Sequence, residues 1–169
     1  MSNMNSKSKQ KMAVTIPAAI ALVILYIIIF RFSDQDGETS SSISQDISRQ
    51  CVELGDTVTG STWSAELKES LSLVWEHPIR KLAHFSEYAI MGALLYLLFD
   101  QWMKRGLRMY GLIVLWVVVS AAADEFHQFF LPGRMCSPVD VCIDTLGAVT
   151  ALLLCAGINK LLKKLTKPK

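Results

Sequence analysis

Residues 13–30 read AVTIPAAIALVILYIIIF, a run of eighteen residues without a charged side chain. As a helix, this run is long enough to cross most of the roughly 30 Å hydrocarbon core of a bilayer. The next residues, 31–34 (RFSD), lack the small-x-small pattern of a signal-peptide cleavage site. We therefore expect a retained transmembrane helix over about 13–31.

Three further apolar segments, at about 82–100, 109–130 and 138–159, carry their charges at one end. The chain is 51% hydrophobic and 19% charged, with a mean hydropathy of +0.34, and these segments hold most of the apolar excess. Such clustering excludes a disordered chain, a disulfide-rich miniprotein and a water-soluble enzyme with one large core. With a net charge of +2 and no basic stripe, the chain is not expected to bind nucleic acid. We predict an all-α, integral membrane four-helix bundle that forms a single domain over 1–169.

The distribution of Lys and Arg predicts the orientation in the membrane. Eleven of the seventeen basic residues fall in the N-terminal tail, the link between the second and third spans, and the C-terminal tail. A four-span topology places these three stretches on one side, and cytoplasmic loops are the ones enriched in Lys and Arg. We therefore predict a multi-pass cell-membrane protein with both termini cytoplasmic (N-in/C-in). Residues 32–80 and 131–138 would then be extracytoplasmic.

The segment 32–80 has the pattern of two short amphipathic helices separated by a Gly/Ser/Thr break at 55–62. These helices would either lie on the outer membrane surface or form a small cap packed on the bundle. Pro78 is expected to end the second one just before the next span. Cys51 and Cys136 both fall in extracytoplasmic segments, where they could form a disulfide. Apolar residues recur at helical spacing at Ile43, Ile47, Cys51 and Leu54, and again at Leu67, Leu71, Val74 and Trp75.

Ionisable residues within the spans all fall near the predicted extracytoplasmic side. A charged side chain near the bilayer centre costs about 2.5–3.5 kcal/mol on insertion scales, so such residues indicate function. Because three different spans contribute them, we expect one shared polar pocket in the outer leaflet. His84 and Glu87 begin the second span, Asp124, Glu125, His127 and Gln128 end the third, and Asp140 and Asp144 begin the fourth.

Helical spacing places these residues on defined faces. His84 and Glu87 share a stripe that continues past Gly92, and Asp144 shares one with Gly147. Small residues beneath polar ends predict a close approach of the helices below the pocket. Glu125 points about 100° away from its neighbour in the sequence, which predicts a different role for it.

The connection between the third and fourth spans contains recognisable turn and cap patterns. Pro132 and Gly133 suit the central positions of a type II turn, which would hold Arg134 beside the acids. Residues 137–140 (SPVD) have the form of a capping box with proline at the first helical position. Asp140 is accordingly either a helix cap or a pocket residue.

Other site residues also have a structural interpretation. Arg80 and Lys81 lie where snorkelling cations anchor the end of a span. The polar residues of the spans could equally hold the helices together through hydrogen bonds.

Three blocks of sequence together resemble the VanZ-like family: 80–88 (RKLAHFSEY), 124–134 (DEFHQFFLPGR) and 140–147 (DVCIDTLG). Residues 32–35 (FSDQ) resemble that family too. The resemblance implies a small bacterial membrane protein with four helices. The name-giving member of the family is associated with low-level resistance to teicoplanin, a lipid-tailed glycopeptide that targets cell-wall precursors. The resemblance therefore implies a role in the cell envelope.

The first functional hypothesis is binding of a lipid headgroup, a lipid-linked wall precursor or the glycopeptide antibiotic. Arginine forks engage phosphate with two parallel hydrogen bonds, whereas acids and amides would contact other headgroup atoms or orient the arginines. The binding residues on this hypothesis are Arg80, Lys81, Glu125, Gln128, Arg134, Asp140 and Asp144.

The second hypothesis is an enzyme that acts on a lipid-linked phosphate or sugar. His84 or His127 would be the general acid or base, oriented by Glu87 or Asp124. A variant adds a divalent metal ion, for which imidazole and carboxylate groups are suitable ligands. Its ligands would come from His84, Glu87, Asp124, His127 and Asp144; no other cofactor is expected. The third hypothesis is a structural or regulatory membrane protein.

Overall fold

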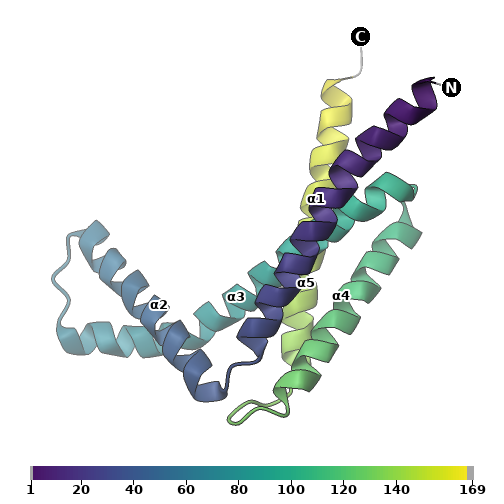
Figure 1. The fold of residues 1–169 in the computed structure, drawn as a ribbon. Helices are drawn as coiled ribbons and strands as arrows, with labels where there is room; N and C mark the ends of the chain where they lie inside the picture. The colour runs from purple at the N-terminus through teal and green to yellow at the C-terminus, as the bar shows by residue number, and fades with distance from the viewer. Residues whose placement is uncertain (1, 167–169) are drawn as a thin grey trace.

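The computed structural model describes residues 2–166, and in this range all regular structure is helical (Figure 1). Four of the five helices, all except α2, are long and apolar enough to cross a membrane. The all-α prediction and the four spans are therefore confirmed. The helices are α1 (Ser2–Ser33), α2 (Gly37–Thr59), α3 (Ala65–Trp102), α4 (Leu107–Gln128) and α5 (Pro138–Leu165).

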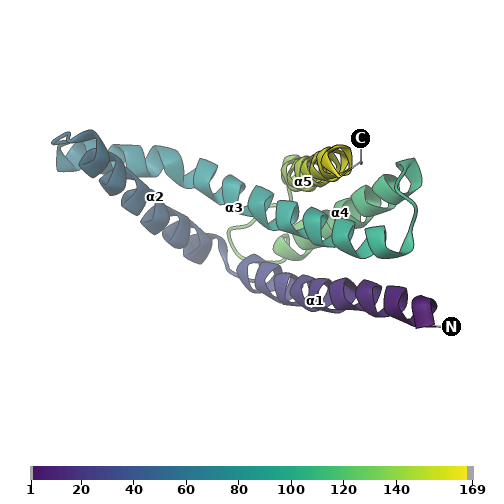
Figure 2. The same cartoon turned by 90° about the horizontal axis from the view of Figure 1, so that it is seen from above.

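Helix α3 is the centre of the molecule, because it packs against each of the other four helices. Helix α5 is its main partner, whereas α1 and α4 make few contacts with each other and diverge (Figure 2). The start of α1 and the end of α5 lie at the same end of the bundle, and the α1–α2 and α4–α5 turns lie at the opposite end (Figure 1). We refer to that opposite end as the turn end.

Two glycines allow α3 and α5 to cross in close contact. A Cβ atom at Gly92 would lie 2.7 Å from the carbonyl oxygen of Ala148, and one at Gly147 would overlap the carbonyl oxygen of Phe85. The predicted approach of small residues beneath the polar ends is thus confirmed. The crossing fixes the α3 and α5 side chains of the turn end relative to each other.

Helix α2 and the first half of α3 form an antiparallel hairpin that projects away from the bundle (Figures 1 and 2). Because α2 packs mainly on α3, the hairpin is not a cap over the bundle. The prediction that Pro78 ends a helix is wrong, since α3 runs through it. Pro78 is exposed, so its ring displaces no packed neighbour, and the helix loses only one backbone hydrogen bond. Cys51 and Cys136 are free thiols, so the considered disulfide is absent.

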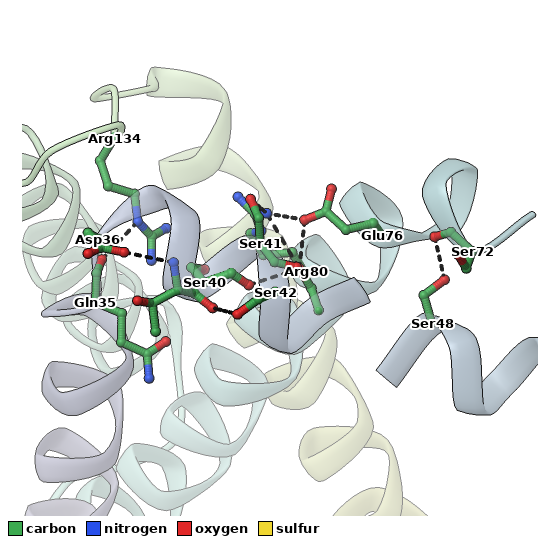
Figure 3. A network of polar contacts seen from close by, with 12 residues as sticks. Gln35, Asp36, Ser40, Ser41, Ser42, Ser48, Ser72, Glu76, Arg80 and Arg134 are labelled. Carbon is green, nitrogen blue, oxygen red and sulfur yellow. Dashed lines mark hydrogen bonds and ion pairs between the residues drawn. The ribbon is translucent and has the colours of Figure 1, made fainter. Parts of the chain in front are cut away.

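The interface within this hairpin is polar, and its exposed surface carries both charged ion pairs and apolar residues. Ser48 is fully buried and donates a hydrogen bond to the carbonyl oxygen of Ser72 at 2.7 Å (Figure 3). In contrast, Ile47, Leu54 and Val58 share the exposed side of α2.

Candidate functional site

The polar residues of the turn end line two cavities. The first, of about 150 Å³, lies between the hairpin and the end of α1, and we call it the arginine cavity. Its polar lining consists mainly of Arg80, His84 and Glu87 from α3 and of Arg134 from the α4–α5 turn. The rest is largely apolar, with Phe32, Ile43, Ile47, Ile79 and Ala83.

Arg80 is held by side chains of the hairpin. Its guanidinium donates to the hydroxyl of Ser41 at 2.6 Å and forms an ion pair with Glu76, one helical turn earlier (Figure 3). Ser44 donates to the same Glu76 carboxylate at 2.6 Å. The Nε atom of Arg80 is buried without a hydrogen-bond partner. Arg80 is therefore an ordered part of the cavity wall, and not only a snorkelling anchor.

Arg134 is positioned by the predicted turn. The Arg134 amide donates to the carbonyl oxygen of Leu131 at 3.2 Å, and Gly133 has φ +72°, as a type II turn requires. The Gly37 amide donates to the carbonyl oxygen of Pro132 at 2.9 Å, which ties this turn to the start of α2. The turn, the hairpin and the end of α1 thus enclose the cavity together.

Among the described residues, the guanidinium of Arg134 binds neutral oxygens. Its Nε donates to the carbonyl oxygen of Gln35 at 3.2 Å (Figure 3), and its Nη1 donates to Oε1 of Gln128 at 3.4 Å. Within residues 2–166, no carboxylate lies within ion-pair distance of it. Burial and the nearby charge of Arg80 lower the pKa of Arg134, whereas the charges of Asp124, Glu125 and Asp36, which lie beyond ion-pair distance, raise it. Because an arginine stays protonated in proteins, its burial and the second cation favour an anion in direct contact with it.

The second cavity, of about 380 Å³, lies between α1 and α4, and we call it the acidic cavity. Asp124 accepts a hydrogen bond from Nε2 of Gln128 at 3.0 Å. His127 lies 3.3 Å from a carboxylate oxygen of Asp34 and stacks on Phe30, both from the α1 side. The lining consists of Tyr26, Ile29, Phe30, Tyr88, Val119, Ser120, Ala123, Asp124 and His127.

The expected single pocket is thus replaced by two. His84 lines the arginine cavity, whereas His127 lines the acidic cavity. Asp144 is only 1% exposed, and both of its carboxyl oxygens lack a hydrogen-bond partner. Its electrostatic neighbours include Asp124 and Glu87. Across residues 2–166, no three His, Cys, Asp or Glu side chains come together in a group that could hold a metal ion, so the considered ligand set is not assembled.

Two acids connect helices at the turn end. Glu125, 2% exposed, accepts a hydrogen bond from the Ser137 amide at 2.8 Å, whereas Asp140 forms an ion pair with Lys81. The predicted capping box at 137–140 is therefore wrong: Ser137 is the N-cap residue, but its side chain makes no cap hydrogen bond. Glu125 of α4 satisfies the amide that a capping-box acid would satisfy. Glu125 and Asp124 therefore have different hydrogen-bond partners, the Ser137 amide and Gln128 respectively.

Comparison with known families adds to this geometry. The model of the VanZ/LLP1 family matches residues 18–162. The chain belongs to the VanZ/LLP1 family. No curated protein and no solved structure matches it. With four apolar helices of spanning length, this VanZ/LLP1 protein is a multi-pass membrane protein.

Several residues that shape the VanZ/LLP1 site escaped the sequence analysis. Glu76 was missed, although its spacing of four residues from Arg80 on a helix is a known ion-pair signal. Tyr26 was missed because it lies within an otherwise apolar span. Its hydroxyl bonds to that of Ser120 at 2.6 Å and accepts a hydrogen bond from Trp116 at 2.7 Å. No local sequence pattern predicts these hydrogen bonds between α1 and α4.

Proposed function

We propose that this protein binds the phosphate of a membrane lipid headgroup in the arginine cavity. The observation that carries the proposal is the guanidinium of Arg134, which lines the cavity without an acidic partner. Arg80 lines the same cavity, and two arginines around one anion relieve their mutual repulsion. Arginine forks match phosphate oxygens in geometry and charge.

The surroundings of the cavity favour a lipid over a soluble phosphate. Ile43, Ile47 and Phe32 line it, and all three side chains are more than a third exposed. These exposed apolar side chains lie beside the arginines, so a ligand with a hydrocarbon portion keeps apolar contacts next to its phosphate. Lys81 forms an ion pair with Asp140, so we propose that Lys81 holds α3 and α5 together and does not bind the phosphate.

Membership of the VanZ/LLP1 family supports an envelope role for such a site. We propose that the turn end faces the outside of the cell and that lipid-linked wall precursors are among its ligands. Binding of these precursors would then oppose a lipid-tailed glycopeptide that targets them. In cells, the wild-type chain should raise the inhibitory concentration of teicoplanin, and Arg134→Gln should abolish this effect at equal membrane abundance. Loss of abundance in that variant would instead support a structural role.

An enzymatic function has less support from the geometry. Nδ1 of His84 lies 3.9 Å from a Glu87 oxygen, which is longer than a hydrogen bond, so the carboxylate does not orient this imidazole. His127 has a carboxylate neighbour, but it lines the other cavity, away from the two arginines. A headgroup phosphate between the arginines would therefore meet no oriented base.

Binding of a short-chain phosphatidic acid to the purified full chain in detergent tests the proposal, with the corresponding diacylglycerol as the uncharged probe. Charge-assisted hydrogen bonds are worth about 1.5–3 kcal/mol, so Arg134→Gln should weaken phosphatidic acid binding about tenfold or more. Arg49→Gln is the matched control, because Arg49 pairs with Glu69 on the exposed surface of the hairpin. Equal binding of the two probes, or unchanged binding to Arg134→Gln, would refute the proposal.

A further inference from the structure

Acidic groups outnumber cations at the turn end. Among the buried and half-buried side chains of this end, the six carboxyl groups are Glu76, Glu87, Asp124, Glu125, Asp140 and Asp144, and the three cations are Arg80, Lys81 and Arg134. Two of the cations are already used in ion pairs, with Glu76 and Asp140. Buried carboxylates without partners are costly, so the excess calls for protons or for a cationic ligand.

Asp124 lines the acidic cavity, and two further acids lie near its wall at Tyr88. The hydroxyl of Tyr88, which lines the cavity, has Asp124, Asp144 and Glu87 as its acidic neighbours. Asp144 is buried behind the lining with both oxygens unpartnered, and Asp124 accepts a hydrogen bond from Gln128. Asp34 adds a further carboxylate at the rim beside His127. The cavity is therefore suited to a cation.

An apolar groove extends the acidic cavity along the bundle. It has a volume of about 550 Å³, lies between α1 and α4, and shares Tyr26, Val119 and Ser120 with the cavity. Its other lining residues, Phe99, Leu112, Leu115 and Trp116, are apolar or aromatic. Both helices are long and apolar enough to span a membrane, so we infer that the groove faces the hydrocarbon layer. A hydrocarbon chain fits it, and the acids lie where the chain would meet a headgroup.

We propose that the acidic cavity binds the primary ammonium of a membrane lipid whose acyl chain lies in the α1–α4 groove. The ammonium donates to the Asp124 carboxylate, and the nearby acids around Tyr88 stabilise its charge. Since Gln128 joins Asp124 to Arg134, the cation site and the phosphate site share one amide but lie in separate cavities. The ammonium site does not depend on the phosphate proposal.

Native mass spectrometry of the full chain, delipidated and then incubated with phosphatidylethanolamine or phosphatidylglycerol of identical chains, tests this site. The wild type should retain the ethanolamine lipid about tenfold better, the value of one charge-assisted hydrogen bond. Asp124→Asn should remove this preference, because the amide keeps its shape but loses its charge. Asp46→Asn, on the exposed face of the hairpin, should leave the preference unchanged.

A second variant covers the case in which Asp124→Asn does not fold. Val119 is 59% exposed and lines both the cavity and the groove, so Val119→Trp should block the chain-binding groove without disturbing the core. It should lower retention of the ethanolamine lipid severalfold. Equal retention of the two lipids by the wild type, a preference that persists in a folded Asp124→Asn variant, or unchanged retention of the ethanolamine lipid by Val119→Trp would overturn the proposal. Arg134→Gln separates the two sites, since it should weaken phosphatidic acid and leave the ethanolamine preference intact.

Discussion

Replacing Gly92 by alanine should weaken the contact between α3 and α5 on which the geometry of the turn end depends. The new Cβ atom would lie 2.8 Å from Cα and 2.7 Å from the carbonyl oxygen of Ala148. Carbon atoms in contact are about 3.5–4.0 Å apart, so the two backbones must separate by roughly 1 Å. Overpacking of this kind costs about 1–3 kcal/mol, against a gain of about 1 kcal/mol in helix propensity.

Gly157→Ala is the matched control, because Gly157 lies inside α5 and nothing surrounds the position of its missing Cβ within 4 Å. This variant keeps the propensity gain without the overpacking. The free energies of unfolding of the two variants should therefore differ by about 1–3 kcal/mol, with Gly92→Ala the less stable. Thermal unfolding in detergent, followed by tryptophan fluorescence, measures the difference. Equal midpoints for the two variants would show that α3 and α5 do not approach as closely as described.

Three further predictions concern other parts of the molecule. Glu125→Ala should lower the free energy of unfolding by about 1–3 kcal/mol because the Ser137 amide loses its acceptor, whereas Glu125→Gln keeps one; equal melting temperatures for these variants would contradict this role. Glu76→Gln removes the ion pair with Arg80, which holds α2 through Ser41 and Ser44, and should therefore speed amide hydrogen exchange in α2 but not in α4. Unchanged exchange in α2 would contradict this stabilising role of Glu76. In a variant with Cys136 as its only cysteine, a membrane-impermeant maleimide should label intact cells, and labelling only after permeabilisation would reverse the proposed topology.

Much of the fold follows from local properties of the sequence. Hydropathy and length identify the four spans, because the bilayer imposes one thickness on each of them. Gly92 and Gly147 reveal the close crossing, since small residues on one face permit backbones to approach. The type II turn that positions Arg134 depends only on the proline and glycine that precede it.

The division of the site into two cavities could not be predicted in this way. Helical spacing correctly places Asp124 and His127 on the same face of α4, but it does not predict which helix packs against that face. Helix α1 meets it, so His127 contacts Asp34 and Phe30 and lies apart from His84. The prediction that a helix ends at Pro78 was wrong because proline is only a local helix-breaking signal. Helix α3 continues through Pro78, since its packing against other helices on both sides of this residue outweighs that signal.

The length of α3 has a mechanical consequence. Its 38 residues form a rod about 57 Å long, nearly twice the roughly 30 Å thickness of the hydrocarbon layer. Close packing at Gly92 makes a pivot, and Ala65 at the far tip lies about 40 Å from it. Helices adapt to thinner or thicker bilayers by tilting, and a 5° tilt about this pivot moves the tip by roughly 3–4 Å. Arg80 lies only about 18 Å from the pivot, so the same tilt moves it by roughly 1.5 Å, and the far tip of the hairpin responds more than twice as strongly to a change in bilayer thickness.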